Sequence, residues 1–465
     1  MLRLFKQYYP IRNIFFVLGE GVFICLSVLI ASWIILGNDL FALNRFLAAK
    51  ILLIAFVCQA CLYYNDLYDF KITDSFRELS IRLLQALGAS AIFLAFVYIV
   101  LPQAIIGTGA FVISICIVIL LIVSWRFCYA LILDRGIFNE KIILLGDSDL
   151  ANEIYEQIKD KKDCGYTLSA MVPESDDPVG CSDRSPADII DQKKYENLCA
   201  MARSMGISKI VVALQERRNS LPINELLQCR IEGIEVIEGH TFFEMLTGKL
   251  IVQTINPGWL IFSEGFQKTR TRRFVKRTID LTLSFVLLLV FLPLIIVISI
   301  LIKMDSKGPV IFSQKRVGAK QKIYRMHKFR SMVEDAEKSS GPVWAEDNDV
   351  RITRIGKIIR MFRFDELPQL WNVLKGEMSF VGPRPERPVF VEELEKIIPY
   401  FSVRSSVKPG ITGWAQICYG YADSLQDAIE KLNYDLFYIK NMSILMDLMI
   451  VLRTIKIVIF ARGAR

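Results

Sequence analysis

Two adjacent carboxylates near the C-terminal end, Asp365 and Glu366, are the residues best suited to catalysis. They open the segment "DELPQLWNVLKGEM", whose pattern predicts a helix with Pro368 in its first turn. Acidic residues at a helix start also interact favourably with the helix dipole, so plain capping is one interpretation. Neighbouring helical residues point about 100° apart. A second interpretation is therefore that one carboxylate faces a reacting phosphorus atom while the other holds Mg²⁺.

Basic residues of the same region stand in motifs that glycine or proline makes rigid. These motifs are "GPVIFSQKRVG", "HKFRSM", "NDVRITRIG", "VGPRPERP" and "KPGITGW". Their basic residues are Lys315, Arg316, Lys328, Arg330, Arg351, Arg354, Arg384, Arg387 and Lys408. An arginine in a rigid turn presents a pre-positioned fork to phosphate or carboxylate, whereas a scattered lysine usually faces solvent. A diphosphate substrate needs such a set of cations together with Mg²⁺.

The composition places these residues in a membrane protein. The 465 residues are 53% hydrophobic, and the mean hydropathy is +0.38, both too high for a soluble protein of this size. The net charge of +8, clustered beside apolar runs, favours a membrane surface or a phosphate-bearing substrate over nucleic acid. We interpret the ten cysteines as unpaired thiols, and the two histidines disfavour a histidine metal site or triad.

Four apolar runs, at residues 13–36, 46–63, 83–101 and 107–125, predict a four-helix transmembrane bundle over residues 1–136. The flanking lysines and arginines place both ends of the bundle in the cytoplasm. No small-residue cleavage site follows the first run, so we do not expect a cleavable signal peptide.

Residues 137–262 predict a Rossmann-like α/β domain with a parallel sheet. In "KIILLGDSDLANEIYEQI" a buried strand leads through a turn into a helix. A dinucleotide site wants G-x-G-x-x-G, but Ser148 replaces the second glycine, and Asp147 and Asp149 are acidic where phosphate would bind. A degenerate domain with a structural or regulatory role is therefore favoured over a dinucleotide-binding one.

Residues 263–465 form the third predicted domain, α-rich, which begins with an apolar helix at 275–303. Its uncharged stretch, 281–302, is long enough to span a membrane. Both flanks are basic, however, and Pro293 interrupts the helix near its centre. A re-entrant helix that bends at Pro293 and returns is thus favoured over a fifth span, and Ser284 could bind carbonyls that the bend frees. The apolar tail suits a helix lying in the membrane interface, or else a core helix.

Residues 272–465 closely resemble the bacterial sugar transferase family, the monotopic polyprenyl-phosphate phosphoglycosyl transferases. The matching segments are "KRTIDLTLSF", "GPVIFSQKRVG", "HKFRSM", "RFDELPQLWNVLKGEMSFVGPRPERP" and "KPGITGWAQI". The bundle and the degenerate domain are similar to the large form of this family. The segments "WAEDND", "NYDLFYIKN" and the final "GAR" resemble its exopolysaccharide- and exosortase-associated branch.

The resemblance implies a two-step reaction. Asp365 would attack the β-phosphate of a UDP-sugar and release UMP, and undecaprenyl phosphate would then take the phosphosugar from Asp365. Glu366 would hold Mg²⁺, and Lys328, Arg330 and Arg384 would contact phosphate. The other candidate substrate contacts are Lys315, Arg316, Arg387 and Lys408. The family's re-entrant helix matches 281–302, although Ser284 is not adjacent to Pro293 as in the Ser-Pro pair of some members.

The expected setting is the bacterial inner membrane, with the catalytic domain on its cytoplasmic face and exopolysaccharide biosynthesis as the process. A homodimer is expected through the domains that lack catalytic motifs, and no nucleic acid is expected to bind. One alternative is a membrane-anchored nucleotide-binding sensor or scaffold without catalysis. Another, a nucleotide-sugar epimerase or dehydratase, would need an intact glycine loop and a Tyr-x-x-x-Lys pair in the α/β domain.

Overall fold

The computed structural model describes most of the chain and divides it into two compact units. The described residues are 2–4, 7–9, 11–37, 46–68, 76–106, 109–134, 139–160, 164–173, 198–214, 221–255, 257–263, 265–333, 351–420 and 424–460. One unit comprises residues 1–4 and 8–239, and the other comprises residues 5–7 and 240–465. The sequence places the corresponding domain boundary at residue 262. The segment "WAEDND" and the final "GAR" lie outside the described residues.

The first unit contains β1, most of β2 and long apolar helices. Its elements are β1 (Leu2–Leu4), β2 (Gln7–Tyr9), α1 (Ile11–Leu36), α3 (Leu47–Tyr64), α4 (Phe76–Val100), η2 (Pro102–Ala104) and α5 (Ala110–Asp134). Helix α1 packs against α5 and α3, and α3 packs against α4. Their inward faces form one apolar core that includes Ile24, Ile51, Leu87 and Ile122. All four helices are long and apolar enough to cross a membrane.

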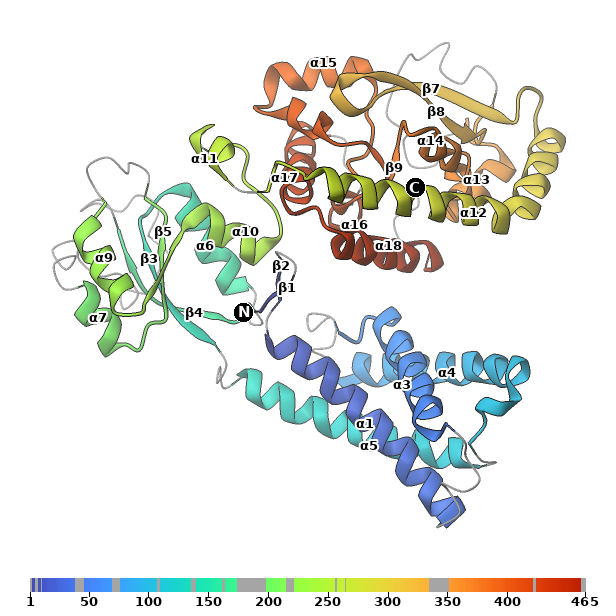
Figure 1. Cartoon of the computed structure of the whole chain (residues 1–465), viewed down its shortest axis with the longest axis horizontal. Coiled ribbons are helices and arrows are strands. Elements are labelled where there is room, and N and C mark those ends of the chain that lie inside the picture. Colours follow the sequence, from blue (N-terminus) through green and yellow to red (C-terminus); the bar gives the residue numbers. More distant parts are fainter. Residues whose placement is uncertain are drawn as a thin grey trace. The chain divides into compact units, whose positions relative to one another are not determined.

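The α/β region of the same unit contains a parallel sheet, as the sequence predicts. Its elements are β3 (Glu140–Leu145), α6 (Asp149–Asp160), β4 (Tyr166–Val172), α7 (Leu198–Ser204), β5 (Lys209–Val212), α9 (Ile223–Ile231) and β6 (Glu235–Glu238). The strand order is β4-β3-β5-β6, and every pairing is parallel. Helices connect the strands (Figure 1), as parallel strands require.

The glycine turn after β3 packs against the end of β5. Gly146 has a φ of 114°, and a Cβ there would lie 2.3 Å from the carbonyl oxygen of Ala213. The Ser148 hydroxyl donates a hydrogen bond to the same carbonyl at 2.6 Å. The order of the strands reverses at this point of the sheet, where doubly wound folds bind their ligands. Close backbone packing at this point supports a structural role for the turn.

The second unit contains the acidic pair and all of the candidate cations. Its first elements are α10 (Gly239–Thr247), α11 (Pro257–Phe262), α12 (Arg270–Asp305), β7 (Ile311–Val317), η5 (Ala319–Gln321), β8 (Ile323–Phe329), α13 (Arg354–Met361) and η6 (Phe364–Glu366). There follow α14 (Gln369–Lys375), β9 (Ser379–Val381), α15 (Pro388–Ile397), η7 (Phe401–Ser406), β10 (Gly410–Thr412), α16 (Trp414–Cys418), α17 (Leu425–Asn441) and α18 (Ile444–Ile459). Strands β7 and β8 form an antiparallel hairpin, and β9 and β10 pair in parallel.

Helix α12 is a single helix of 36 residues that contains Pro293. Figure 1 shows its C-terminal part turning away from the direction of its first part. An internal proline explains such a bend, because it removes a backbone hydrogen bond and crowds the preceding turn. The Ser284 side chain is fully buried, and its Oγ has no hydrogen-bond partner among the described residues. Asp280, also buried, accepts hydrogen bonds from Ser379 Oγ at 2.8 Å and Phe380 N at 3.0 Å, which attaches α12 to β9.

Residues 240–255 form a strap that packs on α16 and α17. Glu244 pairs with Lys440 and accepts a hydrogen bond from Asn441 at 2.6 Å. Asn433 Oδ1 accepts from the backbone N–H of Val252 at 3.0 Å, and Trp414 Nε1 donates to the carbonyl of Gly248 at 2.8 Å. Apolar residues of the strap complete the core of the unit together with α17. The strap is therefore an integral part of the second unit.

The tail helix α18 has a buried face and an exposed apolar face. Met446 and Ile450 are buried in the core of the second unit. Leu448, Leu452 and Ile455 are exposed on the same helix. One face is thus a core face, and the other is an apolar face of the kind that lies on a membrane.

Candidate active site

The acidic pair lies on the short 3₁₀ turn η6, between α13 and α14. The preceding residue, Arg363, has a φ of 53°, a left-handed conformation that is uncommon for a residue with a side chain and clusters at functional sites. Asp365 and Glu366 are only 9% and 7% exposed. Pro368 is the N-cap of α14, and no side chain caps that helix end. The expectation that the pair begins the helix is wrong, because the pair precedes it and caps nothing.

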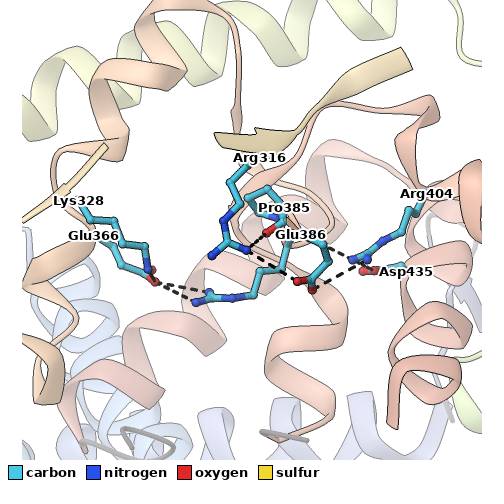
Figure 2. Close-up of polar contacts among 8 residues, drawn as sticks. Arg316, Lys328, Glu366, Pro385, Glu386, Arg404 and Asp435 are labelled. Carbon is cyan, nitrogen blue, oxygen red and sulfur yellow. Dashed lines mark hydrogen bonds and ion pairs between the residues drawn. The ribbon is translucent and has the colours of Figure 1, made fainter. Parts of the chain in front are cut away.

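Glu366 is held by two cations. Lys328 Nζ lies 3.0 Å from its Oε1, and Arg384 Nη2 and Nη1 lie 3.3 and 3.4 Å from the same oxygen (Figure 2). Burial would raise the pKa of Glu366, but the charges of Lys328 and Arg384 outweigh it and lower the pKa to about 2. Glu366 is therefore an ionised carboxylate, and none of the described residues donates a hydrogen bond to its Oε2.

Asp365 has a different environment from its neighbour. Its nearest cation is Lys328, whose Nζ is 3.9 Å from Oδ2, and no described residue donates a hydrogen bond to its carboxylate. Burial raises the pKa of Asp365, the Glu366 charge raises it further, and Lys328 opposes both effects. Of the pair, Glu366 accepts hydrogen bonds from Lys328 and Arg384, and Asp365 accepts none from a described residue.

Close backbone packing fixes the turn that contains Arg384. A Cβ on Gly382 would lie 2.4 Å from the carbonyl oxygen of Lys408, and one on Gly413 would lie 2.2 Å from the carbonyl oxygen of Gly382. Only glycine permits these approaches. The motifs "VGPRPERP" and "KPGITGW" therefore lie side by side, continuing the pairing of β9 with β10.

Two neighbouring residues of β7, Lys315 and Arg316, differ in exposure and in contacts. Arg316 is largely buried, donates to the carbonyl of Pro385 at 3.0 Å and lies 3.8 Å from Glu386. Burial lowers the pKa of Arg316 to about 10. Lys315 is exposed, because successive strand residues point to opposite faces. Arg387 is the N-cap residue of α15, close enough for its charge to act on Arg316. Arg316 and Arg387 thus lie beside the Arg384 turn, and Lys315 points away.

Two further candidate phosphate contacts, Arg330 and Lys408, lie in other surroundings. Arg330 is buried and donates from Nη2 to the carbonyl and hydroxyl of Ser306, while its Nε and Nη1 have no hydrogen-bond partner among the described residues. Lys408 is half-buried, and burial followed by the Arg277 charge lowers its pKa, against the pull of Asp280. Neither forms an ion pair with the acidic pair.

Sequence reasoning missed four residues around the site. Asn372, fully buried on α14, accepts from the backbone N–H of His327 at 3.0 Å and donates to the carbonyl of Arg325 at 2.7 Å, which ties α14 to β8. Arg360, on α13, is close enough for its charge to lower the pKa of Asp365. The sequence signal that could have identified Arg360 is its position, five residues before Asp365.

The other two missed residues, Arg404 and Asp435, form an ion pair of 2.9 Å behind the Arg384 turn. Asp435 stands in "NYDLFYIKN", which forms part of α17. A lone acidic residue on the apolar face of a helix is the signal that would have found it, because buried carboxylates are rare without a partner.

The acidic pair also has the donor chemistry for Mg²⁺. Among the described residues no group of three or more His, Cys, Asp or Glu side chains could hold a metal ion. Mg²⁺ nevertheless binds typically through one or two carboxylates plus substrate phosphates and water. Asp365 and Glu366 Oε2 are two such oxygen donors without protein hydrogen bonds, so the residues present fit this ion.

Comparison with known proteins identifies the region around the site. Residues 271–461 match the family described as bacterial sugar transferase. The chain is 40% identical over 240 residues to the UDP-N-acetylgalactosamine-undecaprenyl-phosphate N-acetylgalactosaminephosphotransferase of Aeromonas hydrophila. That alignment covers 52% of this chain and 56% of the relative, so the chain spans about half the length of that protein.

Two further relatives match different shares of the chain. The exopolysaccharide production protein PSS of Rhizobium leguminosarum bv. phaseoli is 42% identical over 39% of this chain and 93% of its own length. The undecaprenyl-phosphate galactose phosphotransferase of Salmonella typhimurium is 28% identical over 73% of this chain and 75% of its own length. With a relative matched over nearly its whole length, this membrane protein belongs to the bacterial sugar transferase family.

Proposed function

We propose that the protein transfers a sugar 1-phosphate from a UDP-sugar to undecaprenyl phosphate, through a covalent intermediate on Asp365. The observation that supports this most is the division of labour within the acidic pair. Glu366 is fixed by Lys328 and Arg384, whereas Asp365, beside it, accepts no hydrogen bond from a described residue. The acceptor lipid and the class of reaction are those in the names of the relatives, which supports the proposal.

In the first step, an Asp365 oxygen attacks the β-phosphorus of the UDP-sugar, and the bond from that phosphorus to the bridging oxygen breaks. UMP leaves with the bonding electron pair, and an acyl phosphosugar remains on Asp365. In the second step, a phosphate oxygen of undecaprenyl phosphate attacks the same phosphorus, and the bond to Asp365 breaks. The carboxylate is regenerated, and the product is the undecaprenyl diphosphate sugar.

The cations match the charge that this reaction handles. Lys328 and Arg384 converge on Glu366, and Arg316 lies behind the same turn. Fixed cations in a partly buried site stabilise the phosphoryl oxygens without reorganising during the reaction. Glu366 Oε2, with Asp365 and the substrate diphosphate, would hold Mg²⁺, which neutralises charge on the phosphates when bound.

The two substrates come from different phases, one water-soluble and one in the lipid. The apolar stretch of helix α12 has basic residues of the same helix on both sides, and the helix bends along its length. We propose that it enters the cytoplasmic leaflet of the inner membrane, bends at Pro293 and returns. That arrangement sets the acidic pair at the depth of the lipid phosphate. The four apolar helices of the first unit form a transmembrane bundle in the same proposal, and the catalytic unit lies on the cytoplasmic face.

The wider role proposed is the first membrane step of exopolysaccharide biosynthesis, by a homodimer formed through the bundle and the α/β region. One relative is named an exopolysaccharide production protein. The sensor or scaffold alternative is not favoured, because curated relatives are named as phosphotransferases. A monomeric mass in native nanodiscs would contradict the homodimer.

The test is UMP release from a panel of UDP-sugars with Mg²⁺, with and without undecaprenyl phosphate, together with the intact mass of the protein. We expect one sugar to release UMP and to leave a phosphosugar adduct on the wild type. Asp365→Asn should lose both signals, and Asp149→Asn, a matched change in the α/β region, should keep both. The same adduct on Asp365→Asn would place the nucleophile elsewhere, and no UMP from any UDP-sugar would refute the proposed reaction.

A further inference from the structure

The turn that contains Arg384 is held from behind by a second arginine. Arg404 Nη2 donates a hydrogen bond to the backbone carbonyl of Arg384 at 3.0 Å. The Arg384 guanidinium meanwhile lies against Glu366. The Arg384 side chain is 34% exposed, so packing alone does not fix it. Its position depends on where its backbone is held.

Arg404 is itself tightly placed. Its guanidinium pairs with Asp435 at 2.9 Å, lies 3.9 Å from Glu386 and stacks 4.9 Å from the centre of the Phe401 ring. The Arg404 side chain is 11% exposed, and that of Asp435 is 2% exposed. A carboxylate at such a depth is costly to bury unless a cation compensates it. Asp435 and Arg404 therefore depend on each other for their positions.

The same turn has a matching support on its other side. Arg316 donates to the carbonyl of Pro385 at 3.0 Å, and the Glu386 carboxylate lies 3.8 Å from Arg316 and 3.9 Å from Arg404. Figure 2 shows this continuous row of contacts from Lys328 and Glu366 to Arg404 and Asp435. Two largely buried arginines thus hold the backbone carbonyls of two successive residues, Arg384 and Pro385.

We propose that Arg404 and Asp435 are positioning residues for the transfer reaction, which act through the backbone carbonyl of Arg384 to aim its guanidinium at the acidic pair and the reacting phosphate. The inference rests on the proposed function. Neither residue needs to touch the substrate. Ionised Asp435 orients Arg404, Arg404 anchors the turn, and the turn presents Arg384.

The pair also makes this positioning sensitive to acid. Burial raises the pKa of Asp435 to about 6, although Arg404 opposes the rise, and Glu386 adds to it. The charged or titratable groups that face Asp435 are Arg404 from η7, Glu386 from the turn, and Lys431 and Tyr438 from α17 itself. As the pH falls through about 6, Asp435 gains a proton and becomes neutral. The negative charge that orients Arg404 is then lost.

Stability responds to this proton in the opposite sense. The folded protein binds the proton at a higher pH than an unfolded chain, whose aspartates titrate near 3.9. Between about 6 and about 4, protonation of Asp435 therefore favours the folded state. Activity that decreases in this range without a lower melting temperature from this group separates positioning from a purely structural role.

The experiment compares the full-length wild type with Asp435→Asn and Arg404→Lys, measuring kcat and KM for UMP release between pH 5 and 8. We expect kcat to fall about 10- to 100-fold at neutral pH, since misplacement of a catalytic group by about 1 Å costs about that much. KM for the UDP-sugar should change much less than kcat, and Asp435→Asn should lose the decline near pH 6. Glu430→Gln is the matched control, because it removes another paired carboxylate of α17, the partner of Lys249, and should keep the wild-type kcat and pH profile.

A double-mutant cycle tests the route through Arg384. If Arg404 acts through that residue, Asp435→Asn should have almost no further effect on kcat in the Arg384→Met background. An undiminished effect there, or a wild-type kcat and pH profile for Asp435→Asn, would overturn the positioning role. If Asp435→Asn does not fold, Arg404→Lys decides, since it keeps a charge for Asp435 and loses the fork. A wild type that neither releases UMP nor forms the adduct would overturn the proposed function and this inference together, whereas an active wild type isolates the inference.

Discussion

Replacing Lys328 with methionine should move the acid side of the pH–rate profile upward. Lys328 is the cation nearest to Asp365, at 3.9 Å, and its charge opposes the rise in the pKa of that carboxyl. At this distance two unit charges attract by about 4 kcal/mol at an effective dielectric constant of about 20. Lys328 is 19% exposed, so solvent reduces this figure. We expect the pKa of Asp365 to rise when this charge is removed.

The direction in which the acid side of the pH–rate profile moves follows from the role proposed for Asp365. Only the ionised carboxylate attacks phosphorus, so a higher pKa means that a higher pH is needed for the same fraction of active enzyme. The assay is the rate of phosphosugar-adduct formation between pH 5 and 9, followed by intact mass. The measurement is repeated in the Asp435→Asn background, so that a second group titrating near pH 6 does not obscure the shift.

Two controls separate the charge from the loss of a side chain. Lys328→Arg keeps the charge and should keep the acid limb close to that of the wild type. Lys315→Met removes a lysine from the neighbouring strand that points away from the site, and it should leave the profile unchanged. An acid limb that stays in place in Lys328→Met, or moves to lower pH, would refute the electrostatic argument.

Two further predictions concern the framework of the site. Gly382→Ala would force a Cβ to within 2.4 Å of a backbone carbonyl, so we expect a loss of about 1–3 kcal/mol in unfolding free energy and a strong decrease in UMP release. Gly420→Ala, where a Cβ would meet nothing within 4 Å, should change neither, and equal melting temperatures for the two variants would contradict the packing argument. Arg277 donates to two carbonyls at the end of α14, at 2.6 and 2.8 Å, so Arg277→Leu should cost about 1–3 kcal/mol, seen as a lower melting temperature in nanodiscs. Arg273→Leu, at an exposed position of the same helix, is its control, and an equal loss there would show that the two hydrogen bonds contribute nothing.

Local patterns in the sequence predicted the elements of this fold better than their junctions. The long apolar runs and the alternation of strands and helices led to apolar helices and a parallel sheet, and the structure has both. Pro368 suits a first helical turn, so the sequence predicts that the acidic pair begins α14. In the structure α14 begins later, at Gln369, and the pair lies before it on a 3₁₀ turn after left-handed Arg363. Such a backbone reversal at a residue other than glycine has no local sequence signal.

The candidate cations illustrate what spacing alone can and cannot predict. Lys328 and Arg384 stand in rigid motifs that predict phosphate contacts, and the structure brings both to Glu366. Lys315 stands in such a motif too, but strand alternation means that it and its neighbour Arg316 cannot face the same side. Arg404 and Asp435 were missed because they meet only after folding, from segments with no motif in common. Pairs of this kind are decided by tertiary packing.

Because the strap of residues 240–255 packs on the rest of the second unit, the start of that unit's main segment differs from the start of the family region. The recognisable family region begins at residue 271, but the main segment of the compact second unit begins about thirty residues earlier, at residue 240. A shortened protein cut at the family boundary would leave the indole N–H of Trp414 without its carbonyl and uncover apolar core on α17. Exposed apolar surface of this kind promotes aggregation. Shortened forms of this protein for crystallisation or directed evolution are therefore best begun at residue 240 or before, so that the strap is kept.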